Sequence, residues 1–241
     1  MSFTITNIEE FDKLINNREY VEELELATND DINNKIQYLS NLKKLVFTVN
    51  FNTKIDLSKL TNLTHLEFQQ SSDFNQELDL TNNTNLLYLK FGYYFSQQID
   101  LSRLTNLTSL FFGFYYKHSN DLSIHTNLKF LHIGYAGNFG NTDFSQLTNL
   151  TKLQVCQKNP ILLNISNLSN LTYFEFYNYC NQFEIKFSSL INLQYLKLVV
   201  IGCDIFQIDL SKNINLKKIV TTRNTEKMLI LPKHQFSMLV C

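Results

Sequence analysis

The chain has 241 residues, of which 44% are hydrophobic, and its formal net charge is −1. This length and apolar content suffice for a large core in one or two domains. The small net charge excludes a protein-wide field that would draw the chain onto nucleic acid or an anionic membrane, so recognition must depend on local surfaces. Asn, Ile, Lys, Phe and Tyr are abundant, whereas alanine occurs only at Ala27 and Ala136, a bias typical of an AT-rich genome.

Residues 1–19 predict a helical cap. Thr6 and Glu9 have the spacing of a capping box, and one apolar helical face follows, formed by Ile8, Phe11, Leu14 and Ile15. The Asn16-Asn17 pair ends this pattern. The helix is expected to cover the open end of whatever follows it.

The same N-terminal region has no basic segment followed by an apolar run, and no stretch reaches the roughly 20 apolar residues of a membrane span. The cysteines are scattered, without a Cys-x-x-Cys pair or a histidine at ligand spacing, which predicts reduced thiols rather than disulfides or a metal site: Cys156, Cys180, Cys203 and Cys241. We therefore expect a cytoplasmic protein with no membrane segment, no metal and no cofactor.

Residues 20–225 are a tandem repeat with a period of 21 to 23 residues. Each unit contains an Asn-Leu pair, and Tyr20-Val21 is a degenerate first copy; the leucines are Leu42, Leu63, Leu86, Leu107, Leu128, Leu150, Leu171, Leu193 and Leu216. With this leucine as position one, positions four and six are also apolar, as in Leu66 and Phe68. Such alternation predicts a short strand with one buried face. The repeat therefore predicts one solenoid domain with a parallel sheet of about ten short strands.

The path back to the next strand is predicted to be mostly non-helical. Ser58 and its equivalents follow an apolar residue and are expected to cap a single tight turn, while Asp56 and its equivalents are expected to face solvent or bond the neighbouring coil. The Asn before each strand is expected to hydrogen-bond adjacent coils. Residues 226–241 carry an apolar tail that predicts a C-terminal cap, with Met228, Leu229, Ile230, Leu231, Phe236, Met238, Leu239 and Val240.

These units resemble the leucine-rich-repeat family. Leu63-x-x-Leu66-x-Phe68 fits its pattern, and the segment 208–216 is most similar to bacterial internalin-like repeats. The resemblance implies an α/β, right-handed solenoid whose concave sheet binds other macromolecules, usually proteins, without catalysis. In the family, an Asn three residues after the strand forms an internal ladder. The matching positions hold Asn here only at Asn29, Asn50 and Asn224, so the resemblance does not predict the turns of the middle coils.

Positions three, five and seven of each strand are predicted to face the concave side. Gly92, Gly113 and Gly134 are consecutive at position seven, and an aromatic residue follows each of them. These glycines either leave a bare strip for a ligand, or supply a positive φ while the aromatic residues reflect codon bias. The candidate binding residues are Tyr88, Lys90, Gly92, Tyr93, Phe111, Gly113, Phe114, Phe130, His132, Gly134, Tyr135, Tyr173, Glu175 and Tyr195.

The two ends of the chain differ in charge. Residues 1–31 hold nine acids and two bases, a net −7, and residues 211–234 hold six bases and one acid, a net +5. These ends are either solvated caps or a guide for a partner of complementary charge.

No catalytic motif is present, because Gly-x-Ser-x-Gly, His-Glu-x-x-His and Gly-x-Gly-x-x-Gly are all missing. We therefore predict a monomeric, non-catalytic module that binds a protein through its concave face and binds neither nucleic acid nor membrane. The alternative is a carbohydrate or small-ligand binder that uses the aromatic and glycine strip.

Overall fold

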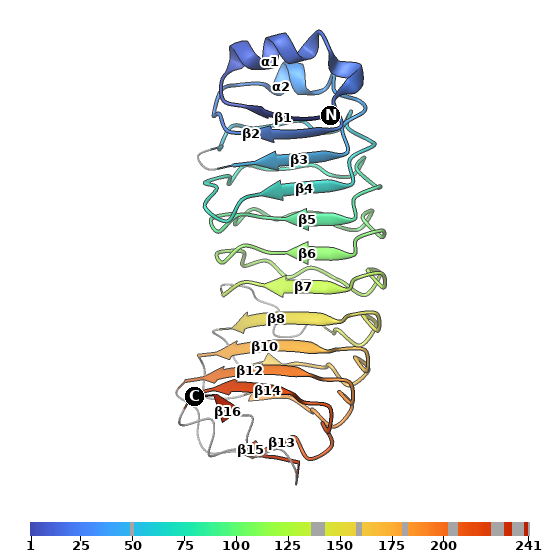
Figure 1. The fold of residues 1–241 in the computed structure, drawn as a ribbon, viewed down its shortest axis with the longest axis vertical. Coiled ribbons are helices and arrows are strands. Elements are labelled where there is room, and N and C mark those ends of the chain that lie inside the picture. Colours follow the sequence, from blue (N-terminus) through green and yellow to red (C-terminus); the bar gives the residue numbers. More distant parts are fainter. Residues whose placement is uncertain are drawn as a thin grey trace. The chain divides into compact units, whose positions relative to one another are not determined.

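The computed structural model describes residues 1–48, 51–135, 143–157, 161–179, 183–201, 207–222, 229–232 and 239–240. The chain divides into two compact units, residues 1–118 and residues 119–241. Both units are stacks of coils, and each coil contributes one strand to a parallel sheet (Figure 1).

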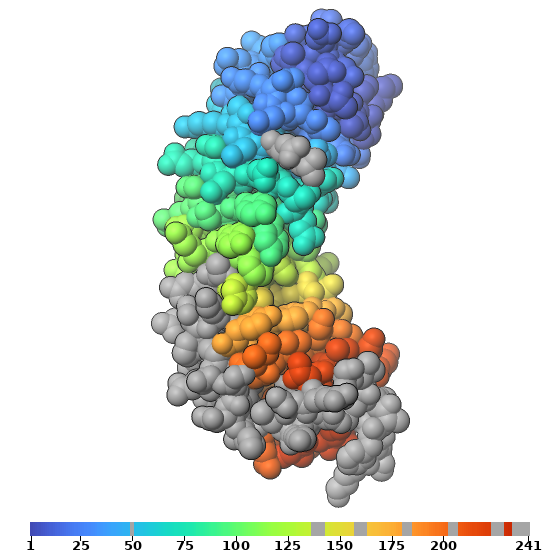
Figure 2. Space-filling view, turned by 90° about the vertical axis from the view of Figure 1, so that its left-hand side faces the viewer, coloured from blue at the N-terminus to red at the C-terminus, as the bar shows by residue number. Residues whose placement is uncertain are grey.

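The sheet of unit 1 contains six parallel strands in chain order, each paired with the next: β1 (Ser2–Ile5), β2 (Glu23–Leu26), β3 (Lys44–Phe47), β4 (His65–Phe68), β5 (Tyr88–Lys90) and β6 (Ser109–Phe111). Buried residues alternate with exposed or half-buried ones along β2, β4, β5 and β6. Position three of one coil lies beside position three of the next, as in Tyr88 and Ser109. Figure 2 shows the coils of unit 1 as successive bands of colour from blue to green. The predicted repeat of one strand per coil is confirmed.

Unit 2 follows the same plan. Its described sheet consists of β7 (Phe130–Ile133), β8 (Lys152–Gln157), β10 (Tyr173–Asn178), β12 (Tyr195–Val200), β14 (Lys218–Thr221) and β16 (Leu239–Val240). Strands β8, β10 and β12 have 6 residues each. On the return path, β9 (Ile161–Leu162) pairs with β11 (Phe183–Glu184), and β13 (Ile208–Asp209) pairs with β15 (Leu229–Ile230). The return side is therefore mostly non-helical, as predicted.

The N-terminal helix is present, but its cap differs by one residue from the prediction. Helix α1 spans Ile8–Ile15 and begins after Asn7, whose side-chain oxygen accepts a hydrogen bond from the Glu10 backbone N–H at 3.0 Å. The Glu10 carboxylate in turn accepts one from the Thr6 backbone N–H at 2.7 Å. The helix buries Phe11 and Leu14, and a 3-10 helix (Arg18–Tyr20) follows. A second short helix, α2 (Asn33–Ile36), lies on the return path of a later coil.

The repeat pattern does not predict strands β1 and β16. Strand β1 occupies residues that the sequence assigns only to a helical cap, and it extends the sheet by pairing with β2. Strand β16 pairs with β14 within the proposed C-terminal cap. Met228, Phe236 and Met238 of that cap lie outside the described residues. The boundaries of both caps stay predictions.

The aspartate on the return path, rather than the serine, caps the tight turn. The Ser102 backbone N–H donates to Asp100 Oδ1 at 2.8 Å, and the same bond recurs from Ser58 to Asp56, Thr81 to Asp79, Ser123 to Asp121, Ser145 to Asp143 and Ser211 to Asp209. A short side-chain oxygen two residues before a free N–H is well placed for this bond. The prediction of a capping serine was wrong here. The aspartates are exposed, as one of the two sequence alternatives expected, and they accept hydrogen bonds from their own turn.

These turns predict a loss of stability in acid. The backbone N–H of Ser102, followed by its hydroxyl, lowers the pKa of Asp100 below its usual 3.8, and Asp56, Asp79 and Asp121 behave alike. A carboxyl whose pKa is lowered by folding stabilises the protein above the unfolded-state pKa, and this stabilisation is lost as pH falls through the folded-state value. Thermal unfolding should therefore shift to lower temperature below about pH 4.

Asp100→Ala should lower the unfolding temperature at neutral pH, because the turn loses its acceptor. Asp100→Asn is the matched control, since Asn164 already accepts from the Ser166 N–H in another coil, at 3.4 Å. An Asp100→Ala variant as stable as Asp100→Asn would contradict the capping role.

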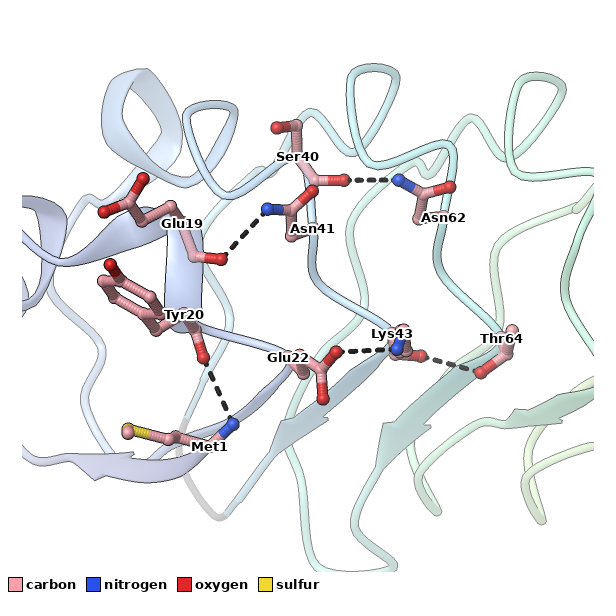
Figure 3. A network of polar contacts seen from close by, with 9 residues as sticks. All are labelled: Met1, Glu19, Tyr20, Glu22, Ser40, Asn41, Lys43, Asn62 and Thr64. Carbon is pink, nitrogen blue, oxygen red and sulfur yellow. Dashed lines mark hydrogen bonds and ion pairs between the residues drawn. The ribbon is translucent and has the colours of Figure 1, made fainter.

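The Asn before each strand forms the predicted contacts between coils (Figure 3). Asn41 Nδ2 donates to the Glu19 carbonyl at 3.0 Å, and Asn62 Nδ2 donates to the Ser40 carbonyl at 2.9 Å. Thr64 adds a second bond, from its hydroxyl to the Lys43 carbonyl at 3.0 Å. The Asn side chains are exposed, so they join the coils at the surface and not within the core. Coil stacking thus accounts for the Asn of the recurring Asn-Leu pair and for the threonine that follows it at Thr64.

An internal asparagine ladder is present in unit 1, and the fixed register finds Asn29 but not the other positions of this ladder. The backbone N–H of Asn52 donates to Asn29 Oδ1, that of Asn75 to Asn52 Oδ1, and that of Ser96 to Asn75 Oδ1, each at 2.9 Å. Loops of different length shift these residues relative to the strand. Asn50 and Asn224 lie outside the described residues.

The core of unit 1 contains two columns of stacked aromatic rings. One column comes from position six of the strands (Phe47, Phe68, Phe91 and Phe112), and the other from the following turns (Phe51, Phe74, Phe95 and Tyr116). Ring centroids within a coil are 4.1 to 4.4 Å apart, as for Phe68 and Phe74 or Phe47 and Phe51. All eight rings are buried. These phenylalanines therefore serve packing, whatever the codon usage of the genome.

Candidate functional site

The unit 1 sheet face comprises the side chains at positions three and five of β2 to β6: Glu23, Glu25, Lys44, Val46, His65, Glu67, Tyr88, Lys90, Ser109 and Phe111. His65 stacks on Tyr88 with centroids 5.2 Å apart, and Tyr88 contacts Phe111 at the same distance. Lys90 Nζ lies 2.8 Å from Glu67 Oε1. Cross-strand register brings these residues together, so a row of rings runs beside an ion pair.

The rings of this face are uncharged at neutral pH. Burial, with a smaller effect of Glu67, raises the pKa of Tyr88 to about 12. Burial, followed by repulsion from Lys44, lowers the pKa of His65 below its usual 6.5. The unit 1 sheet face can therefore offer apolar ring surface and a neutral phenol hydroxyl to a partner.

The unit 2 sheet face comprises the equivalent side chains of β7, β8, β10, β12 and β14, together with Tyr177 at position seven: Phe130, His132, Lys152, Gln154, Tyr173, Glu175, Tyr195, Lys197, Lys218 and Val220. Tyr173 and Tyr195 are stacked, with centroids 4.3 Å apart and planes inclined by 6°. Lys152 Nζ lies 4.7 Å from the Phe130 ring and 4.4 Å from the Tyr173 ring. Aromatic and cationic side chains therefore lie next to one another across the strands.

Glu175 is the acidic residue of this face, and it is 9% exposed. Its carboxylate accepts hydrogen bonds from the hydroxyls of Tyr173 and Tyr177, the latter at 3.2 Å. Burial and then the Glu175 hydrogen bond raise the pKa of Tyr173, while the hydrogen bond with Tyr177 raises that of Lys197. Lys197 Nζ lies 5.0 Å from the Tyr177 ring. The buried Glu175 carboxylate thus positions the hydroxyl groups of Tyr173 and Tyr177, and the Tyr177 ring in turn contacts Lys197.

The glycines at position seven do not form an open strip. A Cβ added at Gly113 would lie 1.9 Å from the Gly92 carbonyl oxygen, and one at Gly92 would lie 2.8 Å from the Gln69 carbonyl oxygen. Neither glycine has a φ in the positive region. The open strip and the positive φ that the sequence suggested are therefore both wrong for these two residues, because the glycines permit close contact between backbones of successive coils. Gly134 is also buried.

The aromatic residues that follow the glycines form a cluster at the edge where the strands of unit 1 end. Tyr93 stacks on Phe114 with centroids 4.7 Å apart, and Tyr94 stacks on Tyr115 at 5.7 Å. Tyr94 and Tyr115 are 48% and 47% exposed. In unit 2, Tyr135 contacts Tyr179 edge to face at 5.1 Å. These aromatic residues therefore border packed backbone, and not a cleft, at Gly92 and Gly113.

The predicted binding residues thus fall on a sheet face and a strand edge in each unit. The sequence-based selection omitted Lys152, Tyr177, Lys197 and Lys218 on the unit 2 sheet face. Lys152, Lys197 and Lys218 stand in the same period-two rows as the selected residues, so that signal was present. Their interaction with neighbouring rings depends on cross-strand register, which the rows alone do not give.

The arrangement is similar to that of two solved proteins from Listeria monocytogenes. The internalin InlF has a TM-score of 0.61 and 22% identity over 81% of this chain and 57% of that chain. Internalin C2 has a TM-score of 0.54 and 22% identity over 78% of this chain and 74% of that one. The chain has the leucine-rich-repeat fold. No family model and no curated protein matches the sequence. The leucine-rich-repeat chain spans little more than half the length of the InlF structure.

The described leucine-rich-repeat coils contain one cysteine, and its surroundings limit its reactivity. Cys156 is a free, half-buried thiol, and burial raises its pKa to about 11, which makes it a poor nucleophile at neutral pH. The other cysteines lie outside the described residues. Among the helices that can be described, none combines the length and apolarity needed to cross a membrane.

Proposed function

We propose that this leucine-rich-repeat protein is a non-catalytic module that binds another protein through its exposed sheet faces. The observation that carries the proposal is the ordering of large aromatic side chains on those faces. Tyr88 with Phe111, and Tyr173 with Tyr195, are half-buried in rows that cross the strands. Aromatic residues held in fixed positions contribute most of the binding energy at protein interfaces.

The carbohydrate or small-ligand alternative has less support than the sequence indicated. It relied on room beside Gly92 and Gly113, and the backbone of the preceding coil occupies that room. Protein binding needs no such cleft, because a broad face with fixed aromatic and charged groups is sufficient. Cytoplasmic location and monomeric state stay predictions.

Photo-crosslinking in the source organism tests the proposal. A photoreactive phenylalanine analogue at Tyr88 or Tyr195 should capture a partner protein. The same analogue at the exposed return-path residues Lys59 or Lys212 should not. Phe111→Ala or Tyr195→Ala should weaken binding of the captured partner about tenfold, or about 1.4 kcal/mol. Crosslinks that arise only from Lys59 or Lys212 would place the interaction on the return side and contradict the proposal.

A further inference from the structure

Three lysines on the unit 2 sheet face lie against aromatic rings and make no ion pair with any carboxylate among the described residues. Lys152 contacts Phe130 and Tyr173, Lys197 lies over Tyr177, and Lys218 lies 5.9 Å from the Tyr195 ring. Within the described part of the chain, none of the three makes an ion pair. In unit 1, by contrast, Lys35, Lys43 and Lys90 are each paired with a carboxylate.

The acidic residue of this face forms no ion pair with these lysines, although its charge attracts Lys197. Glu175 is the acid in the rows of this face, and both of its oxygens accept hydrogen bonds from tyrosine hydroxyls. Three lysines and one glutamate give this face a formal charge of +2. A ring contact covers one side of an ammonium group and leaves N–H donors for another acceptor. The lysines are therefore cations held in fixed positions, with no carboxylate ion-pair partner in the described part of the chain.

We propose that the unit 2 sheet face binds an acidic segment of another protein. This inference rests on the proposed function and specifies the partner's chemistry. Lys152 and Lys197 stand two strands apart and are also offset by two residues along the strand direction, which together correspond to about 12 Å. An extended peptide advances about 3.3 Å per residue, so acidic side chains about three to four residues apart in an extended segment would match these two lysines. Lys218, one strand further, accepts a third acidic group.

The ring geometry favours a protein over a nucleic acid. The Tyr173 ring has Lys152 on one side and Tyr195 on the other, and Tyr195 lies between Tyr173 and Lys218. Single-stranded nucleic acids gain affinity by stacking bases on free aromatic faces. The faces of these two tyrosines are already occupied, so carboxylates that reach the lysines are the better match.

Fluorescence anisotropy with a designed peptide tests the inference. The probe is a fluorescein-labelled peptide of about twelve residues with glutamate at every third position, and its control carries lysine at those positions. The acidic peptide should bind, and binding should weaken as salt is raised, because exposed charges are screened. The combined variant Lys152→Gln, Lys197→Gln and Lys218→Gln should weaken binding at least about tenfold.

A matched variant separates this surface from net charge. Lys129→Gln, Lys186→Gln and Lys212→Gln remove the same charge from exposed positions of unit 2 outside the sheet face and should leave binding unchanged. Lys152→Arg keeps the cation and its ring contacts, so it should retain binding. Equal losses in the two triple variants would overturn the inference.

Other outcomes identify a different occupant. Tighter binding of a uridine oligonucleotide, lost in the sheet-face variant, would show a phosphate-binding surface instead. Concentration-dependent dimerisation lost in the same variant would show that a second copy, with its acidic N-terminal region, occupies the face. If Tyr195 still crosslinks a partner after all three lysines are replaced, the proposed function stands and this inference fails. If neither sheet face crosslinks a protein, the proposed function itself fails.

Discussion

Gly113→Ala is expected to destabilise unit 1 by at least about 3 kcal/mol, because overpacking against backbone cannot be relieved by a side-chain rotation. The new Cβ would lie 1.9 Å from the Gly92 carbonyl oxygen and 3.2 Å from the Tyr93 carbonyl oxygen. Either the two coils must separate or the strand must shift. Denaturant unfolding followed by far-ultraviolet circular dichroism measures the change in the free energy of unfolding.

Two variants control for this effect. Gly92→Ala should cost less than Gly113→Ala, because the nearest atom to its Cβ is at 2.8 Å. Ser109→Val adds a β-branched side chain to an outward position of the same coil, where the strand accommodates it with little change. A Gly113→Ala protein as stable as the Ser109→Val protein would show that the coils are not in close contact at this point.

Phe74→Ala is expected to cost about 3 to 5 kcal/mol, the range for removing a buried aromatic side chain. The Phe74 ring is fully buried and stacks on Phe68 at 4.1 Å and on Phe95 at 6.0 Å. Its loss would leave a cavity between three successive coils and interrupt one of the two aromatic columns. Because coils contact only their neighbours, cooperative unfolding of unit 1 should also become less sharp.

The comparison that isolates burial is Tyr94→Ala. Tyr94 is also aromatic and also follows a strand of unit 1, but it is 48% exposed. Its removal should cost about 1 kcal/mol or less, from the ring contact with Tyr115. Similar costs for Phe74→Ala and Tyr94→Ala would contradict the assignment of the aromatic columns to the core.

Two features of the fold were open to prediction because they repeat at a fixed interval. Leu63 and its equivalents recur in every coil together with apolar residues at positions four and six. This pattern specifies a strand with one buried face in each coil. The Asn before the strand recurs at a constant distance from that leucine, so its bond to the preceding coil repeats as well. Local periodicity is sufficient here because each coil meets its neighbours in the same register.

Contacts that depend on loop length were not open to prediction in this way. Asn29, Asn52 and Asn75 form one ladder although they stand at different distances from their strands. Phe74 likewise joins the second aromatic column from a longer turn than Phe51 or Phe95. Only the folded structure aligns such residues. An insertion in a loop changes the distance in sequence between a residue and its strand, but it does not change the spacing between successive coils.

The sequence by itself determined the repeat, the parallel sheet and the residues that share its exposed face. Only the tertiary structure decided that Gly92 and Gly113 are packing contacts, because the space beside a glycine depends on the approach of another coil's backbone. It also decided that Lys152 lies between two rings and that Glu175 bonds two tyrosine hydroxyls. These arrangements depend on side-chain conformations across neighbouring strands, which the order of residues along one strand does not specify.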